Sequence, residues 1–288
     1  MAQASQEGGM VHPVFRFAPS PNGKLHLGHA YSALLNERMA REAGGRLLVR
    51  IEDIDKERCT PTHVQAALQD LHWLGLDFEE DVLFQSQRMA DYRDAVARLM
   101  EMGLLYVCTC SRKTLADHES EHPGLRHDPE GQLLYPGTCR RIAHKFSSDS
   151  ALRLMMDEAL RRTVQAAGGV PLSWIEKGVR ELASPALWGD VIIARRGIGT
   201  SYHLSVVVDD AFQGITDIVR GEDLREQTVI HRVLQVLLGL PEPRYHHHPL
   251  IRHESGRKLA KSKGDTSLAD LREAGVSPGE IRRDLGFA

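Results

Sequence analysis

The sequence predicts an α/β fold built on a parallel sheet with crossover helices. Two observations predict it. Over residues 14–102 short apolar runs alternate with stretches of helical periodicity, and glycines and prolines mark where these segments end. The chain has 288 residues, of which 42% are hydrophobic and 26% are charged. This composition excludes a disordered or fibrous protein, and the length allows one large domain or two smaller ones.

The elements of the first part follow one another as strand, helix, strand and helix. Residues 14–18 (VFRFA) form the first strand, which ends at the turn-forming PSPNG. A helix over residues 27–42 stops at the Gly44–Gly45 pair, because glycine is common just after a helix. The later elements of this part are a strand over 46–53, a helix from Thr60–Pro61 to about Leu74, and a helix over 90–102.

Beyond Leu104 this periodicity is lost. Residues 108–150 contain three of the four cysteines, several histidines and three prolines, which is typical of a loop-rich insertion. Residues 190–195 (DVIIAR) are predicted to form one strand of a hairpin that turns at Gly197 and Gly199. The remaining predicted elements are apolar segments over 203–211 and 215–223, an amphipathic helix over 227–238, a strand entered at HHHPLI (246–251), and short helices over 267–274 and 277–285.

The net charge of −3 gives no sign of a broadly basic nucleic-acid-binding protein. The charge is unevenly distributed, however. Residues 52–94 carry eleven acids and four bases, as expected of solvated helix faces. Residues 251–263 carry five bases and one acid, which favours an anion-binding loop. The chain opens without a hydrophobic segment and has no apolar run of about 20 residues, so we expect a cytoplasmic protein that does not enter a membrane.

A pair of histidines follows the first predicted strand, in PSPNGKLHLGH. His26 and His29 lie on either side of Gly28, where a turn leads into a helix. The N-terminus of a helix offers backbone N–H groups and the positive end of its dipole, which suit a phosphate. Imidazoles can donate hydrogen bonds to that phosphate, and glycine lets a flat ligand approach the backbone. Histidines at this spacing are also common as a structural pair, so the motif gains its weight from its place between strand and helix.

Two lysines, Lys258 and Lys261, stand in the basic segment GRKLAKSK. Lysine is a compact and mobile charge, which suits a loop that closes over a polyphosphate. Taken by itself, the segment is more typical of a solvated surface turn.

The cysteines of the insertion predict a structural zinc site. Cys108, Cys110 and Cys139 lie in an aperiodic stretch, and zinc stabilises domains that lack a core of their own. Unpaired cysteines in a loop are the alternative, and Cys59 stands apart from the three. By ligand chemistry the fourth donor would be a histidine, with His118, His122, His127 and His144 available.

HLGH near the start and KLAKS near the end resemble the two signature motifs of class I aminoacyl-tRNA synthetases. Four segments in order, RFAPSPNGKLHLGHAYSALLN, LLVRIEDID, DDAFQGITDIVRGEDL and KLAKS, are similar to the glutamyl-tRNA synthetase branch. The resemblance implies a Rossmann-like parallel sheet with helices on both faces, a zinc-containing insertion domain and a short helical tail. It divides the chain into residues 1–104 and 187–245 for the two halves of the nucleotide-binding domain, 105–186 for the insertion, and 246–288 for the lysine loop and C-terminal helices.

The resemblance implies activation of an amino acid by ATP to an aminoacyl-adenylate, followed by transfer to an RNA hydroxyl. Catalysis would rest on positioning and charge, with Mg²⁺ accompanying ATP and no protein nucleophile. Ala260 stands where the family usually has serine, which puts hydrogen bonding in the loop in question. The residues implied for ATP binding are His26, Gly28, His29 and Lys261, and those implied for catalysis are His26, His29, Lys258 and Lys261.

The resemblance also implies L-glutamate as the amino acid. Arg16 suits a substrate carboxylate, because a guanidinium binds a carboxylate with two parallel hydrogen bonds. Glu52, at the carboxyl end of a predicted strand, would take the substrate ammonium group. A structural set of ion pairs is the alternative reading of these charges. The residues carried over as glutamate contacts are Arg16, Phe17, Ala18, Pro19, Ser20, Glu52, Tyr202 and Arg220.

A short branch of the family, the glutamyl-Q tRNA(Asp) synthetases, shares the Cys-x-Cys and Tyr-x-x-x-Cys spacing of residues 108–110 and 135–139. This resemblance implies one zinc per chain, with Tyr135 as the fourth ligand beside the three cysteines. The branch transfers activated glutamate to queuosine in the anticodon stem-loop of tRNA(Asp). Only 26 residues follow Ser262, which is too few for an anticodon-reading domain, and we therefore expect this activity in a monomer.

Three alternatives remain. The chain could be a stand-alone catalytic domain of a glutamyl-tRNA synthetase. It could be a nucleotidylyltransferase of the wider HxGH superfamily, although that group typically lacks the RFAPS and VRGEDL segments. It could also be a non-catalytic RNA-binding paralogue, which would not require the histidine and lysine pairs.

Overall fold

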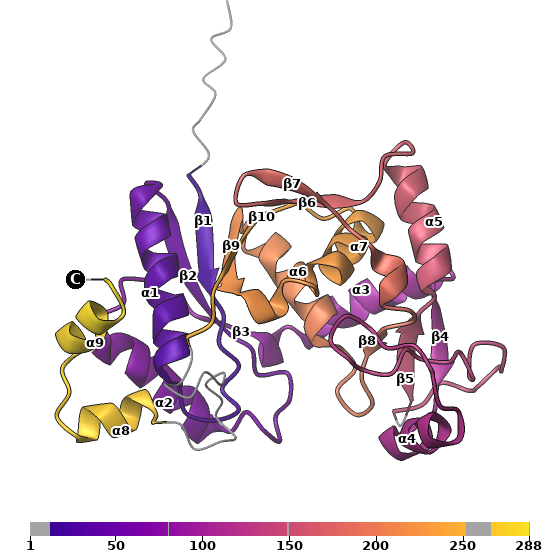
Figure 1. Ribbon diagram of the computed structural model, residues 1–288, viewed down its shortest axis with the longest axis horizontal. Coiled ribbons are helices and arrows are strands. Elements are labelled where there is room, and N and C mark those ends of the chain that lie inside the picture. Colours follow the sequence, from indigo (N-terminus) through magenta and orange to yellow (C-terminus); the bar gives the residue numbers. More distant parts are fainter. Residues whose placement is uncertain (1–11, 80, 149, 252–265, 288) are drawn as a thin grey trace, which may run out of the picture.

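The computed structural model describes residues 12–79, 81–148, 150–251 and 266–287. Its main feature is a seven-stranded sheet with the order β3-β2-β1-β9-β10-β6-β7 (Figure 1). Neighbouring strands run parallel from β3 to β6, whereas β7 pairs antiparallel with β6. The strands in this order are Leu83–Phe84, Arg46–Ile51, Val14–Phe17, Asp217–Gly221, Arg244–His248, Ser173–Glu176 and Val179–Leu182.

Helices cover both faces of this sheet. Successive side chains of a strand point to opposite faces, so Phe15 packs into one hydrophobic core and Val14 into the other. The core that holds Phe15 is covered by α1 (Leu27–Glu42), α2 (Pro61–Trp73), α8 (Leu268–Glu273) and α9 (Pro278–Asp284). The core that holds Val14 is covered by α3 (Met89–Glu101), α5 (Met156–Ala166), α6 (Tyr202–Phe212) and α7 (Thr228–Leu238). The α/β class with a mostly parallel sheet is therefore confirmed.

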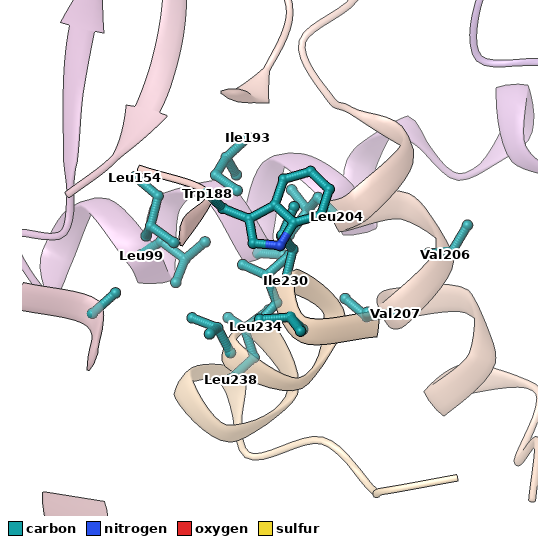
Figure 2. Packing of buried hydrophobic residues seen from close by; sticks show 14 of the residues in the cluster. Leu99, Leu154, Trp188, Ile193, Leu204, Val206, Val207, Ile230, Leu234 and Leu238 are labelled. Carbon is teal, nitrogen blue, oxygen red and sulfur yellow. The ribbon is translucent and has the colours of Figure 1, made fainter. Parts of the chain in front are cut away.

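The core on the α3, α5, α6 and α7 side also joins the main sheet to the rest of the chain. Figure 2 shows Trp188 among leucine, isoleucine and valine side chains from several elements. Leu99 of α3, Ile193 and Ile230 of α7 are all fully buried. Each buried aliphatic side chain of this size stabilises the fold by about 1.5–3 kcal/mol. This shared core holds the two sheets in one packed unit.

The second sheet is small and antiparallel, with the order β4-β5-β8. Its strands are β4 (Leu105–Cys108), β5 (Ala151–Leu154) and β8 (Ile192–Ala194). Between β4 and β5 the chain is mostly irregular and contains α4 (Arg112–Glu121), of which no residue is buried. Strands β6 and β7, which follow in the chain, belong to the main sheet and not to this one.

The predicted hairpin after residue 190 is wrong. Strand β8 pairs with β5, where Leu152 lies opposite Ala194, and the apolar segment that follows is the helix α6. Ser201 begins this helix by accepting a hydrogen bond from the Leu204 backbone N–H (3.4 Å). Because α6 is buried on most of its surface, its apolar residues show no clear helical period, and its three consecutive valines favour a strand locally. Short 3₁₀ turns cover Gln85–Gln87, Pro185–Leu187 and Glu222–Leu224.

The other predicted helices and strands are confirmed to within a few residues at each end. Among the described residues, no helix combines the length and the apolar character needed to cross a bilayer.

Candidate active site

A cleft of about 1060 Å³ opens at the carboxyl ends of β1, β2 and β9. In the sheet, β1 lies between β2 and β9. In α/β folds, ligands bind in the crevice outside the carboxyl ends of the parallel strands, at the point where the strand order reverses. The described residues predicted to bind nucleotide and glutamate all line this cleft, namely Arg16, Phe17, Ala18, Pro19, Ser20, His26, Gly28, His29, Glu52, Tyr202 and Arg220.

The two histidines of HLGH hold the first turn of α1. The ring of His26, the N-cap residue, accepts a hydrogen bond at Nδ1 from the Gly28 backbone N–H (3.1 Å). His29 Nδ1 accepts from the His26 backbone N–H (3.2 Å), and the two ring centroids lie 3.9 Å apart. Because each Nδ1 accepts a bond, a neutral ring carries its proton on Nε2, as a donor. These are donors of the kind that a phosphate needs at a helix N-terminus.

Gly28 has a structural reason that its sequence context did not reveal. A Cβ at this position would lie 3.0 Å from Cε1 of the His26 ring. A side chain here would therefore press against the ring that caps the helix, and the ring would have to move by a few tenths of an ångström to make room.

The base of α8 is joined to the turn before α1. The Leu268 N–H donates to the Leu25 carbonyl (2.8 Å), and Lys24 Nζ lies 2.7 Å from Asp270 Oδ1. Ile251 and Ser267 both line the cleft. The predicted catalytic residues Lys258 and Lys261 fall between these two and lie outside the described residues.

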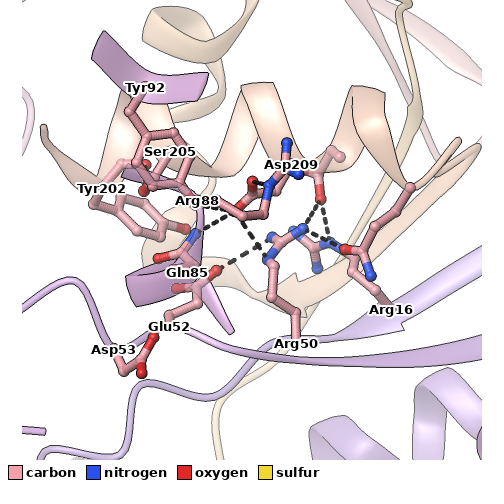
Figure 3. Close-up of polar contacts among 12 residues, drawn as sticks. Arg16, Arg50, Glu52, Asp53, Gln85, Arg88, Tyr92, Tyr202, Ser205 and Asp209 are labelled. Carbon is pink, nitrogen blue, oxygen red and sulfur yellow. Dashed lines mark hydrogen bonds and ion pairs between the residues drawn. The ribbon is translucent and has the colours of Figure 1, made fainter. Parts of the chain in front are cut away.

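An ion-pair network lies beneath the cleft (Figure 3). Arg50 Nη1 and Arg16 Nε both donate to Asp210 Oδ1, at 2.7 and 3.1 Å, and Arg50 Nη2 donates to Glu52 Oε1 (3.2 Å). Arg50 is fully buried, and the other three residues are at most 9% exposed. Arg16 lines the cleft and bonds Asp210 through its Nε atom. This bond fixes the orientation of the Arg16 guanidinium. The network therefore fixes one cation and one anion at the cleft floor.

Asp209, which is next to Asp210 in the chain, is a further buried carboxylate with its own set of hydrogen bonds. Asp209 accepts hydrogen bonds from Arg88 Nε (2.7 Å), Tyr92 OH (2.7 Å) and Gln85 Nε2 (2.8 Å), as Figure 3 shows. Sequence reasoning assigned no role to Asp209, Asp210 or Arg50. The available signal was the pair of adjacent aspartates in an otherwise apolar segment, since buried carboxylates are rare unless they are paired.

Burial raises the pKa of the Glu52 carboxyl, although Arg50 and Arg16 oppose this shift. A further cation beside Glu52 would stabilise its ionised form. Glu52 thus suits a ligand's ammonium group.

Arg220 and Tyr202 also belong to this site. Arg220 Nη1 donates to the Tyr202 hydroxyl (3.3 Å), and both residues line the cleft. With Arg16 and Glu52 they supply two guanidinium groups, a carboxylate and a hydroxyl, which can bind an amino acid with two carboxylates and an ammonium group. Other charged residues, among them Arg58, Arg195, Asp55 and Asp223, line the cleft as well.

The three predicted cysteine ligands come together at the edge of the second sheet. Cys108, Cys110 and Cys139 have their Sγ atoms within 4.8 Å of one another, an arrangement that could hold a metal such as zinc. The Tyr135 hydroxyl lies 3.4 Å from Cys108 Sγ and 3.5 Å from Cys110 Sγ. The pKa of Cys139 is lowered to about 6: burial opposes the shift, and hydrogen bonds from Tyr135 and the Thr109 backbone drive it. A thiolate is the form that binds metal.

None of the predicted histidine ligands joins the cysteine group among the described residues. His127 bonds Glu119 (2.8 Å), and the rings of His118 and His122 stack on each other at 4.3 Å. Tyr135 is held in place by Arg153, whose guanidinium lies 3.8 Å from its ring centroid. Of the two predicted kinds of fourth donor, the tyrosine is the one beside the thiols.

A family model described as the catalytic domain of class I tRNA synthetases (E and Q) matches residues 13–286. The chain belongs to this family. It is therefore an enzyme of the synthetase type, a ligase. A glutamyl-Q tRNA(Asp) synthetase from Rhodobacter capsulatus is 48% identical over 280 residues, which cover 95% of this chain and all of the relative. Another from Leptothrix cholodnii is 40% identical and covers 91% of this chain and 86% of its own.

Solved structures of class I synthetases share the fold. A glutamate-tRNA synthetase from Elizabethkingia anophelis superposes with a TM-score of 0.69 at 22% identity, over 88% of this chain. The matched region is 53% of that protein, so this chain spans about half its length. A methionyl-tRNA synthetase from Mycobacterium tuberculosis, in complex with methionyl-adenylate, gives a TM-score of 0.63 at 12% identity, over 95% of this chain and 64% of its own.

Proposed function

We propose that this synthetase activates L-glutamate with ATP and transfers the glutamyl group to queuosine in the anticodon of tRNA(Asp). The observation that carries the proposal is the cleft at the carboxyl ends of β1, β2 and β9, which Arg16, Glu52 and Arg220 line together with the HLGH turn of α1. The names of the two relatives support the acceptor, since both are glutamyl-Q tRNA(Asp) synthetases that match most of this chain.

In the first step, a carboxylate oxygen of glutamate attacks the α-phosphorus of ATP, and pyrophosphate leaves. Glu52 binds the ammonium group, while Arg16 and Arg220 with Tyr202 bind carboxylates. The Nε2–H groups of the two histidines donate to phosphate oxygens as charge builds in the transition state. ATP brings Mg²⁺ as its counter-ion, and Lys258 and Lys261 neutralise the leaving pyrophosphate. The protein supplies position and charge, and no covalent bond to it is formed.

In the second step, a hydroxyl of queuosine attacks the carbonyl carbon of glutamyl-adenylate, an ester forms, and AMP leaves.

We place zinc on Cys108, Cys110, Cys139 and Tyr135. Its role would be structural, because these residues lie in a segment with little core of its own. We also propose the four segments 1–104, 105–186, 187–245 and 246–288 as functional units of a cytoplasmic monomer.

Glutamate-dependent exchange of pyrophosphate into ATP tests the first step. The Lys261→Ala variant should lower the exchange rate by about a hundredfold, the usual effect of removing one group that stabilises transition-state charge. Lys263→Ala, in the same basic segment, is the matched control and should retain the rate. If no amino acid supports exchange by the wild-type chain, the proposal is defeated, and unfolding of the Lys261→Ala variant would contradict a catalytic role for that lysine.

The acceptor is tested with labelled glutamate and three RNAs. We expect labelling of tRNA(Asp) that carries queuosine, and none of the same tRNA without it or of tRNA(Glu). Equal labelling of tRNA(Glu) would instead support a stand-alone glutamyl-tRNA synthetase domain. Exchange without transfer to any RNA would indicate a different acceptor.

A further inference from the structure

Two of the arginines that line the cleft, Arg16 and Arg220, are held in contrasting ways. Arg16 bonds a carboxylate, Asp210, at 3.1 Å. The acceptors around Arg220 are all neutral atoms, and among the described residues no carboxylate oxygen lies within ion-pairing distance of it. The neutral acceptors that Arg220 bonds are Tyr202 OH (3.3 Å), His231 Nδ1 (3.3 Å), His247 Nε2 (3.1 Å), Thr228 Oγ1 (2.7 Å) and the Leu224 carbonyl (3.1 Å).

The hydrogen-bond directions fix the state of both histidines. A guanidinium only donates, so His231 must accept at Nδ1 and His247 must accept at Nε2. A neutral His231 therefore carries its proton on Nε2, which lies 3.3 Å from Nδ1 of His203. A neutral His247 carries its proton on Nδ1, which lies 2.7 Å from Glu176 Oε2. The two rings must hold opposite tautomers, and neither can be protonated without placing a donor against Arg220.

Glu176 is the carboxylate of this group, and the imidazole of His247 separates it from Arg220. It binds His247 twice, at the ring and at the backbone N–H (2.9 Å). It thereby selects the tautomer of His247 without contacting the guanidinium. Arg220 is 5% exposed, and its neighbours His231 and His247 are 1% and 3% exposed. The positive charge of Arg220 is thus desolvated and held in place, and within the part of the chain that the structure describes it has no bonded counter-charge.

We propose that His231 and His247 are positioning residues that keep Arg220 as an uncompensated cation, so that it and Tyr202 together select a substrate carboxylate over its neutral amide. The inference rests on the proposed function, because it concerns the amino acid that the cleft binds. A substrate carboxylate in the cleft would contact the Tyr202 hydroxyl and accept from Nη1 of Arg220. The two hydrogen bonds that Nη1 makes within the protein are the longest ones of Arg220, so this group can be shared with a ligand. A carboxylate from the protein at either histidine position would compete with that ligand.

The surrounding charges reinforce the neutral state of the rings. Burial lowers the pKa of His231 well below its ordinary value, and the cations Arg220 and Arg16 and the rings of His203 and His247 act in the same direction. Burial also lowers the pKa of His247, with Arg220 and Arg225 acting the same way and Glu176 opposing them. The pKa of His203 falls to about 4 through burial and the charge of Arg220. Among the described residues, Tyr202 and Tyr245 are further titratable neighbours: the Tyr202 ring lies 5.6 Å from that of His231, and the Tyr245 ring lies 6.1 Å from that of His247.

A matched pair of variants tests the charge argument. The amide of Asn places a neutral acceptor near the position of histidine Nδ1, and Asp places a charge there. We expect His231→Asn to keep the KM for glutamate within about threefold of wild type, and His231→Asp to raise it by at least about tenfold with a smaller change in kcat, because the new ion pair competes with the substrate. His247→Gln and His247→Glu form a second pair at the Nε2 acceptor. His246→Gln is the control: His246 bonds Asp217 (2.9 Å), away from Arg220.

Equal KM values for the neutral and charged members of both pairs would overturn the proposal. If an acidic variant fails to fold, the tautomers themselves decide. Side-chain ¹⁵N NMR of the full chain at about pH 6 should show His231 protonated on Nε2 and His247 on Nδ1, both neutral, although free histidine is largely protonated there. A doubly protonated ring at either position would overturn it. This measurement needs no turnover, so it stands even if glutamate-dependent exchange is absent and the proposed function fails.

Discussion

The cleft and the cysteine group are held together by different means. The cleft lies between two large hydrophobic cores, and its charged side chains are fixed by bonds to other buried side chains. The cysteine group lies in a segment whose helix α4 has no buried residue, and its own apolar cluster is small. The cleft is thus arranged by the protein's own buried contacts, whereas the insertion has few such contacts, and the proposed zinc would have to supply them.

The largest expected effect is in the insertion. Cys108→Ser should abolish zinc binding, since structural zinc sites bind with apparent free energies of about 10–16 kcal/mol and losing one thiolate removes most of that. Elemental analysis should fall from one zinc per chain to none, and hydrogen exchange should accelerate over residues 108–150 but not in β1 or β9. Cys59→Ser, outside the group, should keep its zinc. Full zinc retention by Cys108→Ser would rule the site out.

The next effect is in the cleft. Asp210→Ala leaves the buried Arg50 and Arg16 without their shared carboxylate, and removing one partner of a buried ion pair costs about 3–5 kcal/mol. Chemical denaturation should show this loss in the main transition, with zinc still bound. A loss below about 1 kcal/mol would mean that the network is not what arranges the cleft.

A third prediction concerns the pH dependence of stability and tests Asp217, which lies at the start of β9, at the end of the strand away from the cleft. Asp217 is bonded to His246, Arg244 and Thr216; burial opposes the shift, but these bonds hold the pKa of its carboxyl below the ordinary value. A lowered folded-state pKa stabilises the protein above the unfolded pKa of about 4, and this contribution is lost as the pH falls through the folded-state value. The stability gap between wild type and Asp217→Asn should therefore be largest near neutral pH and shrink below about pH 4. A gap that is constant from neutral pH down through that range would contradict the assignment.

The smallest effect should be at the surface. Lys24 and Asp270 form an exposed pair, with side chains 53% and 46% accessible. Solvent and salt screen such pairs, so Asp270→Asn should leave the denaturation midpoint unchanged within error. The Asn side chain can still accept the hydrogen bond that Asp270 takes from the Ser267 N–H at the start of α8 (3.1 Å), so a clear destabilisation would show that the ion pair itself stabilises the join between α8 and the HLGH turn.

Much of this architecture follows from local sequence patterns, and the exceptions have physical causes. Strands such as β1 and helices such as α1 are bounded by strong turn signals and show clear periods, so their positions were predictable. Helix α6 was not, because burial on most sides removes the amphipathic pattern that identifies a helix. The pairing of β8 with β5 was hidden because α5, β6 and β7 lie between the two strands in the chain, and β6 and β7 belong to the other sheet.

The candidate site divides in the same way. Residues within short motifs, such as His26 and His29, could be identified because one turn brings them together. Arg50, Asp209 and the histidines around Arg220 act through contacts between distant elements, and a linear sequence does not show which buried polar groups meet. The bond between Arg50 and Asp210 joins residues 160 positions apart. The fourth donor of the cysteine group could be predicted only in part. Ligand chemistry alone favours a histidine, whereas the spacing shared with a related branch indicates Tyr135.

The place of β1 in the sheet has a consequence for synthesis. The Val14 N–H donates to Thr216 Oγ1, 202 positions later, and Phe15 lies opposite Asp217 in the β1–β9 ladder. While a ribosome is still making the chain, the β9 side of β1 has no partner until about 220 residues have left the exit tunnel. Contacts of such long sequence separation form late and slowly. Until then the β9 side of β1 is open to wrong pairing, and the part of the cleft that β9 supplies, Arg220 included, is missing.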